Sequence, residues 1–144
     1  MLELTEEMQE AINNSLADQH PVVFASVGAD GQPRLGFVGS IHVHSRDQFA
    51  IWLRKADSTS ADNIRANPKL AFLYRNPEKR QSWQFHGRAQ VIEDPALRQR
   101  VYDESPEAER NFDAEMQGHA VVIDLDRIIE RGQVIQEREP ANEQ

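Results

Sequence analysis

A succession of short segments in which apolar and polar residues alternate is the feature that most constrains the fold of this chain. Residues 22–27 and 34–38 are the first two such segments, and Asp30-Gly31 lies between them. An Asp-Gly pair at this place is typical of a β-hairpin, because the turn needs positive φ angles that both residues tolerate. These residues therefore predict two adjacent antiparallel strands.

Further strands follow from the same pattern. Each segment has the length of a strand and is either alternating or continuously apolar. Within one of them, Gly87 predicts a β-bulge or a close approach of two backbones, since glycine has no side chain. The predicted strands cover residues 41–44, 49–53, 69–75, 83–91 and 121–125, and residues 128–135 are expected to add another.

Capping signals predict helices at three places. Thr5 is a good N-cap for a first helix, and the charges of Glu6 and Glu7 suit the positive end of its dipole. A short helix is expected over residues 61–66, after three possible N-cap residues and before an Asn-Pro pair. Two consecutive helical pieces are expected between residues 95 and 116.

The number and order of these segments predict the architecture. Six or seven strands with a helix inserted between them favour a mainly β (α+β) fold, an antiparallel split β-barrel with peripheral helices. The 144 residues, of which 39% are hydrophobic, suffice for one core. We therefore expect a single domain over residues 1–136 and a polar tail over residues 137–144.

Composition excludes several classes of function. A formal net charge of −8 opposes binding to nucleic acid, and the absence of cysteine excludes disulfides, thiolate nucleophiles and cysteine-ligated metal sites. No apolar stretch approaches the roughly 20 residues that span a bilayer, so no membrane partner is expected. The acidic start of the sequence does not resemble a secretory signal, and a cytoplasmic location is expected by default.

Three sequence motifs occur in a fixed order: ASVGADGQP at residues 25–33, NIRANPKLAFLY at residues 63–74 and FHGRAQV at residues 85–91. In this order they resemble the pyridoxamine 5′-phosphate oxidase-like family of FMN-binding split barrels. The similarity extends from about residue 24 to residue 102. The resemblance implies a homodimer that binds FMN in a cleft at the subunit interface.

The resemblance also implies a place for the cofactor. Its phosphate would lie near the start of the short helix, where backbone N–H groups and the helix dipole attract anions. Adjacent residues of a strand point to opposite faces, so only one of Arg54 and Lys55 is expected to face the phosphate, and the sequence does not choose between them. The implied cofactor-binding residues are Leu53, Arg54, Lys55, Ser58, Thr59 and Ser60, with Ser82 near the flavin ring.

The function expected from this resemblance is that of an FMN-dependent oxidoreductase acting on a small molecule, with no side chain named as catalytic. The members that make vitamin B6 carry a C-terminal Trp, which residues 127–144 lack, so genuine pyridoxamine-phosphate oxidation is not expected. The alternatives are a deazaflavin-dependent reductase, a non-enzymatic flavin- or haem-binding module, and a dimeric barrel that has lost its ligand.

Individual aromatic and histidine side chains lead to further expectations about interfaces and metal or haem binding. Trp52 is out of phase with its apolar neighbours, so it is expected to face away from the core and to serve a subunit interface. His42 and His44 share one strand face, for which a solvated polar surface is expected rather than a metal site. No metal is expected, and His86 or His119 would be the haem ligand in the haem-binding alternative.

Overall fold

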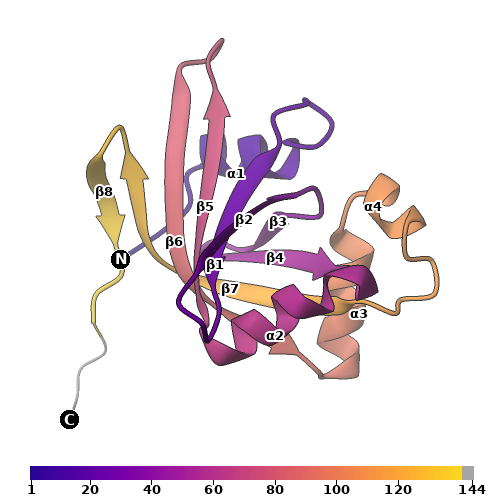
Figure 1. Ribbon diagram of the computed structural model, residues 1–144. Helices are drawn as coiled ribbons and strands as arrows, with labels where there is room; N and C mark the ends of the chain where they lie inside the picture. The colour runs from indigo at the N-terminus through magenta and orange to yellow at the C-terminus, as the bar shows by residue number, and fades with distance from the viewer. Residues whose placement is uncertain (141–144) are drawn as a thin grey trace.

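The computed structural model describes residues 1–140 and contains a single eight-stranded antiparallel sheet. The strand order is β2-β1-β5-β6-β7-β4-β3, with β8 paired to β7, so that β2 and β3 are edges and the barrel is split between them (Figure 1). The strands are β1 (Val22–Val27), β2 (Pro33–Val38), β3 (His42–Ser45), β4 (Gln48–Leu53), β5 (Lys69–Asn76), β6 (Gln81–Ile92), β7 (His119–Glu130) and β8 (Gln133–Glu137). The predicted split barrel with peripheral helices is confirmed.

The first hairpin forms as the sequence predicts. Val22 pairs with Val38 and Val27 pairs with Pro33 across β1 and β2. In the turn, Asp30 Oδ1 accepts a hydrogen bond from the N–H of Gln32 at 3.1 Å, and Gly31 has a φ of 77°. The Asp-Gly pair thus supplies both the side-chain acceptor and the left-handed backbone that this turn requires.

Helices cover the open parts of the sheet. Thr5 caps α1, since its Oγ1 accepts a hydrogen bond from the N–H of Met8 at 3.1 Å, and Asp94 caps α3 by accepting one from the N–H of Leu97 at 2.9 Å. Figure 1 shows α3 and α4 together at one side of the sheet and α2 at the end opposite the β5–β6 turn. The helices are α1 (Glu6–Asn13), α2 (Ser58–Ala66), α3 (Pro95–Glu104) and α4 (Glu107–Asn111), and a 3-10 turn, η1 (Lys55–Asp57), leads into α2.

Two apolar clusters hold these layers together. Inside the curved sheet, the ring of Phe49 meets Phe72 and Phe85 edge-on at centroid distances of 5.7 and 4.9 Å. The second cluster lies on the opposite face of β4, where Trp52 packs against Val101 of α3. The alternation of β4 thus divides its side chains between the two clusters.

Trp52 corrects one expectation from the sequence. Its side chain faces away from the main core as predicted, but it is only 4% exposed because α3 covers it. The ring of Tyr102 meets it edge-on at 5.1 Å, and Arg98 lies over its face at 4.9 Å. A subunit interface through Trp52 is therefore wrong, since the chain buries this residue itself.

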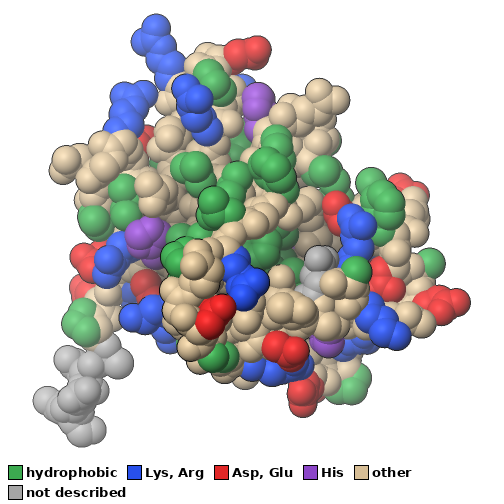
Figure 2. All heavy atoms as spheres, viewed as in Figure 1, with side chains coloured by type: hydrophobic (Ala, Val, Ile, Leu, Met, Phe, Trp, Pro, Cys, Tyr) green, Lys and Arg blue, Asp and Glu red, His purple; other side chains and the backbone are tan. Residues whose placement is uncertain are grey.

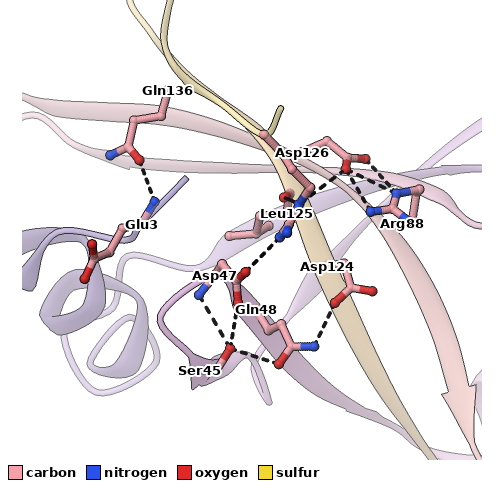
Figure 3. A network of polar contacts seen from close by, with 10 residues as sticks. Glu3, Ser45, Asp47, Gln48, Arg88, Asp124, Leu125, Asp126 and Gln136 are labelled. Carbon is pink, nitrogen blue, oxygen red and sulfur yellow. Dashed lines mark hydrogen bonds and ion pairs between the residues drawn. The ribbon is translucent and has the colours of Figure 1, made fainter. Parts of the chain in front are cut away.

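The C-terminal part of the described chain is joined to the β3–β4 turn by polar contacts (Figure 3). Arg138 donates hydrogen bonds to the carbonyl oxygen of Leu125 at 2.8 Å and to Asp47 Oδ2 at 3.0 Å. Asp126 accepts hydrogen bonds from Arg88 on β6. The boundary expected at residue 136 falls inside β8, and residues 141–144 of the expected tail lie outside the described residues. No helix within residues 1–140 is both long and apolar enough to span a membrane.

Candidate functional site

A pocket of about 530 Å³ lies where the barrel is split, beneath the edge strand β2. One wall is formed by residues 34–39, which comprise most of β2 and the residue after it. The opposite wall comes from the end of β4, from α2 and from α4, which contribute Leu53, Arg54, Ser60 and Glu109. The volume falls within the range of about 300–1,000 Å³ that small-molecule sites occupy.

Arg54 is the cation that the end of β4 delivers to this pocket. Leu53, the last residue of β4, pairs with His119 of β7, and Arg54 follows it with an extended backbone before η1 begins. The Arg54 guanidinium lies 3.2 Å from Glu109 Oε2 and 4.1 Å from the centre of the Phe112 ring. Its position is therefore fixed by an ion pair and a cation–π contact, both with the region of α4.

The structure separates the other cofactor-binding residues expected near this helix. Ser60 lines the pocket, whereas Lys55 and Thr59 are exposed and do not line it. The hydroxyl of Ser58 is also outside the pocket and donates a hydrogen bond to the carbonyl oxygen of Lys55 at 2.6 Å. Of the two cations that the sequence could not tell apart, Arg54 is the one in the pocket.

The helix begins earlier than expected. The predicted start at residue 61 is wrong, because η1 begins at Lys55 and α2 continues from Ser58. Ser60 therefore lies inside the helical segment, and the positive end of the dipole lies nearer to Arg54. The hydroxyl of Ser60 and the charge of Arg54, rather than a row of free N–H groups at Ser60, are what this helix offers to an anion.

Ser82 does not join these residues within one chain. It lies at the start of β6, where it pairs with Arg75, and it is not part of the pocket. The β5–β6 turn beside it and helix α2 lie at opposite ends of the molecule (Figure 1). The expected flavin-contacting serine and the expected phosphate-binding residues are thus on different parts of the protomer.

Glu109 is the pocket residue that the sequence did not point to. Its side chain is 14% exposed, and its carboxylate lies against Gly39, where a Cβ atom would collide with Oε1. Glu109 is 55 positions from Arg54, and one acidic residue in an acidic helix carries no signal for such a contact. The backbone of β2 was also missed as a wall of the site, since a strand pattern does not reveal which edge stays unpaired.

His42 of β3 corrects a second expectation. His42 is only 5% exposed rather than solvated, and its Nδ1 lies 2.9 Å from the carbonyl oxygen of Ser40. Nε2 has no hydrogen-bond partner among the described residues and lies 4.0 Å from Glu104 Oε2. Burial lowers the pKa of His42 below its ordinary value. No group of three or more His, Asp or Glu side chains within residues 1–140 is arranged to hold a metal ion.

Comparison with known proteins places this geometry in a family. A sequence profile described as "Pyridoxamine 5'-phosphate oxidase" matches residues 4–127, whereas no curated protein matches. Crystal structures of several bacterial proteins share the fold. HupZ of Group A Streptococcus is 21% identical over 92% of this chain and 99% of its own, with a TM-score of 0.74. HutZ of Vibrio cholerae, described as a haem storage protein, is 15% identical over 84% and 92%, with a TM-score of 0.63.

A third relative, general stress protein 26 of Bacillus anthracis, is 17% identical over 85% of this chain and 92% of its own, with a TM-score of 0.60. Identities this low establish the common split barrel and nothing about ligands. The profile match is the stronger finding, since it covers most of the chain, including β2, α2 and the pocket between them. The chain therefore belongs to the pyridoxamine 5′-phosphate oxidase family.

Proposed function

We propose that this protein is an FMN-binding oxidoreductase that holds the cofactor phosphate in the pocket between β2 and α2. The observation that carries the proposal is the meeting of the Arg54 guanidinium and Ser60 at one pocket beside the helical segment that begins at Lys55. A guanidinium and a hydroxyl are donors suited to a phosphate monoester. Bound FMN would supply hydride or electron transfer to a small-molecule substrate.

The composition of the pocket is compatible with this cofactor. Phe24 and Leu53 give it apolar walls, and the exposed guanidinium of Arg34 lies at its rim. Small-molecule sites commonly combine apolar walls with a few fixed polar groups, as this pocket does. The residues of this chain would therefore bind, orient and partly desolvate the cofactor, and none is assigned a proton transfer.

We further propose that the protein acts as a homodimer. On the outer face of the sheet, Leu35 and Phe37 of β2 are 78% and 74% exposed, and Leu73 of β5 is 42% exposed. The register places these three residues on one side, with Val23 between Phe37 and Leu73. Figure 2 shows hydrophobic side chains gathered in the middle of the viewed face, a pattern typical of an interface.

A second copy of this chain is the occupant that this face favours, because Ser82 is far from Arg54 in one protomer. A cofactor that contacts both residues needs Ser82 from another chain. Packing of two apolar faces also follows the closed symmetry that most homo-oligomers adopt. The homodimer and the cofactor site thus form one proposal, because a site that includes both Ser82 and Arg54 needs two chains.

Titration of FMN by fluorescence quenching tests the proposal. Arg54→Met should weaken FMN at least tenfold, and Ser60→Ala should weaken it by a smaller factor, because each removes a donor to the phosphate. Lys55→Met and Ser58→Ala are the matched controls, since neither side chain lines the pocket, and their affinities should equal that of the wild type. Equal affinities in all four variants would contradict the proposed site.

One observation favours a second candidate, a haem-binding module. His86 lines a separate cavity of about 360 Å³, and burial, with the nearby charge of Arg127, lowers the pKa of His86. The imidazole is then neutral near pH 7, the form that ligates iron. HutZ, which has the same fold, is described as a haem storage protein. A Soret band that is absent from His86→Ala would favour this module, whereas flavin absorption bands would favour the oxidoreductase.

A further inference from the structure

We propose that Glu109 is a built-in competitor for the phosphate subsite, so that an anionic ligand binds only as this carboxylate leaves Arg54. The inference rests on the proposed function, since it concerns the same pocket. It adds that α4 regulates the affinity of that pocket for anions. The structure then corresponds to the closed state, in which Arg54 is paired with Glu109.

The first observation is that Glu109 occupies one donor group of the cation that a phosphate needs. Glu109 Oε2 lies 3.2 Å from Arg54 Nη2, and the carboxylate side chain is 14% exposed while that of Arg54 is 40% exposed. A phosphate that approached the same Nη2 group would meet the carboxylate at short range and be repelled by its like charge. Binding of a phosphate at Nη2 therefore requires withdrawal of the carboxylate.

The second observation is that the pocket has room for the carboxylate. At Gly39, just after β2, an added Cβ atom would collide with Glu109 Oε1. The missing side chain at Gly39 thus creates the space in which the Glu109 carboxylate lies against the wall of the pocket. The acidic group is inside the site rather than on the surface of α4.

The third observation concerns what has to move. The segment around Glu109 is anchored, because the carbonyl oxygens of Arg110 and Asp113 lie 3.2 and 3.0 Å from the Tyr102 hydroxyl and share its one proton. Trp52 Nε1 also donates to Asp113 Oδ2. Glu109 itself has only its side-chain torsions to change, so its carboxylate can leave Arg54 while α4 stays in place.

When the closed state predominates, the apparent affinity of the pocket equals the affinity of the open state multiplied by the fraction of molecules that are open. Glu109→Gln removes the charge and keeps the size of the side chain, so it should raise FMN affinity at least tenfold over that of the wild type. Glu107→Gln, an exposed change on the same short helix, should leave the affinity unaltered. Riboflavin has the same ring without the phosphate, and its affinity should be equal in the wild type and in both variants.

The double variant Arg54→Met/Glu109→Gln completes a double-mutant cycle. With the cation gone, the gain from Glu109→Gln should disappear, which a general loosening of the pocket would not produce. An FMN affinity that is equal in the wild type and Glu109→Gln would overturn the inference while leaving the proposed function intact. A gain that persists without Arg54 would overturn it as well.

Inorganic phosphate separates failure of this inference from failure of the proposed function. If no variant binds FMN, the proposed function is wrong. The competitor role would still stand if phosphate raises the midpoint of thermal unfolding more in Glu109→Gln than in Glu107→Gln. Equal responses of the two variants to phosphate, together with no FMN binding, would overturn both proposals.

Discussion

Trp52 Nε1 donates a hydrogen bond to Asp113 Oδ2 at 2.8 Å, and this contact joins β4 to the segment that follows α4. Asp113 also accepts hydrogen bonds from the backbone N–H groups of Gln117 and Gly118. Although burial acts to raise the pKa of Asp113, these hydrogen bonds outweigh it and hold the pKa below its ordinary value. Asp113 is thus an ionised acceptor around which the chain between α4 and β7 is organised.

Replacing Trp52 by Phe should therefore destabilise the protein measurably. The aromatic contact with Tyr102 is largely kept, while a hydrogen bond to a charged group, worth about 1.5–3 kcal/mol, is lost. We expect the free energy of unfolding, measured in urea at neutral pH, to fall by about 2 kcal/mol. A change within about 0.5 kcal/mol, as for ordinary surface substitutions, would contradict this account.

Burial of His42 predicts a loss of stability in mild acid. Because the folded state lowers the pKa of His42, the unfolded chain takes up the proton first as the pH falls below about 6.5. The contribution of neutral His42 is therefore complete above the unfolded pKa and is lost as the pH falls through the lowered folded pKa. The hydrogen bond to the Ser40 carbonyl and the charge of Glu104 oppose this lowering, whereas the charge of Arg100 adds to it.

A His42→Gln variant, which cannot titrate, tests this pH dependence. Between about pH 7.5 and about pH 5, the free energy of unfolding should fall more steeply in the wild type, by up to about 1.4 kcal/mol per pH unit. The comparison uses thermal or urea unfolding of both proteins in the same buffers. Parallel pH profiles would show that His42 does not control acid stability.

The exposed outer face predicts a self-association that one charge can abolish. Phe37→Glu places a carboxylate in the apolar patch on β2, where its desolvation would oppose dimer formation. We expect the wild type to sediment as a dimer at micromolar concentration and the variant as a monomer. Ala96→Glu, on the exposed start of α3, adds the same charge elsewhere and should remain dimeric. A monomeric wild type would argue against the shared cofactor site.

Gly87 lies where the neighbouring strand leaves no space for a side chain. Its register with β7 shifts at a bulge between His86 and Gly87, and an added Cβ would lie 2.5 Å from the carbonyl oxygen of Asp124 and 2.7 Å from Ile123 Cγ2. Gly87→Ala should cost about 1–3 kcal/mol in the free energy of unfolding, since two paired strands must separate slightly. Gly28→Ala should cost less, because the atom in the way is the movable Asn63 side chain. Equal losses of unfolding free energy in the two variants would contradict this explanation.

Local chemistry explains which parts of the fold the sequence predicts well. The Asp30-Gly31 turn and the Thr5 and Asp94 caps depend on residues within a few positions of one another. Periodicity also assigns Trp52 to the correct face of β4, yet it contains nothing about what covers that face. The covering helix, α3, is about fifty residues further along, so the interface expected at Trp52 was wrong.

The candidate site also contains residues that the sequence predicts and residues that only the tertiary fold brings together. Arg54 and Ser60 are close in sequence, and the expectation of an anion site there needed only a strand end followed by a helix. The opposing β2 wall and Glu109 become neighbours of Arg54 only through the tertiary fold. The separation of Ser82 from this pocket likewise depends on which end of a long strand it occupies. Spacing along a chain does not determine any of these relationships.

The contact between Glu3 and Gln136 in Figure 3 has a consequence for engineering. The N–H of Glu3 donates to Gln136 Oε1 at 2.7 Å, and the N–H of Leu4 donates to the carbonyl oxygen of Arg46 at 2.7 Å. The two ends of the described barrel thus meet on one side of the molecule. A short flexible linker between them would permit circular permutation, with new termini opened in an exposed turn outside the proposed cofactor site.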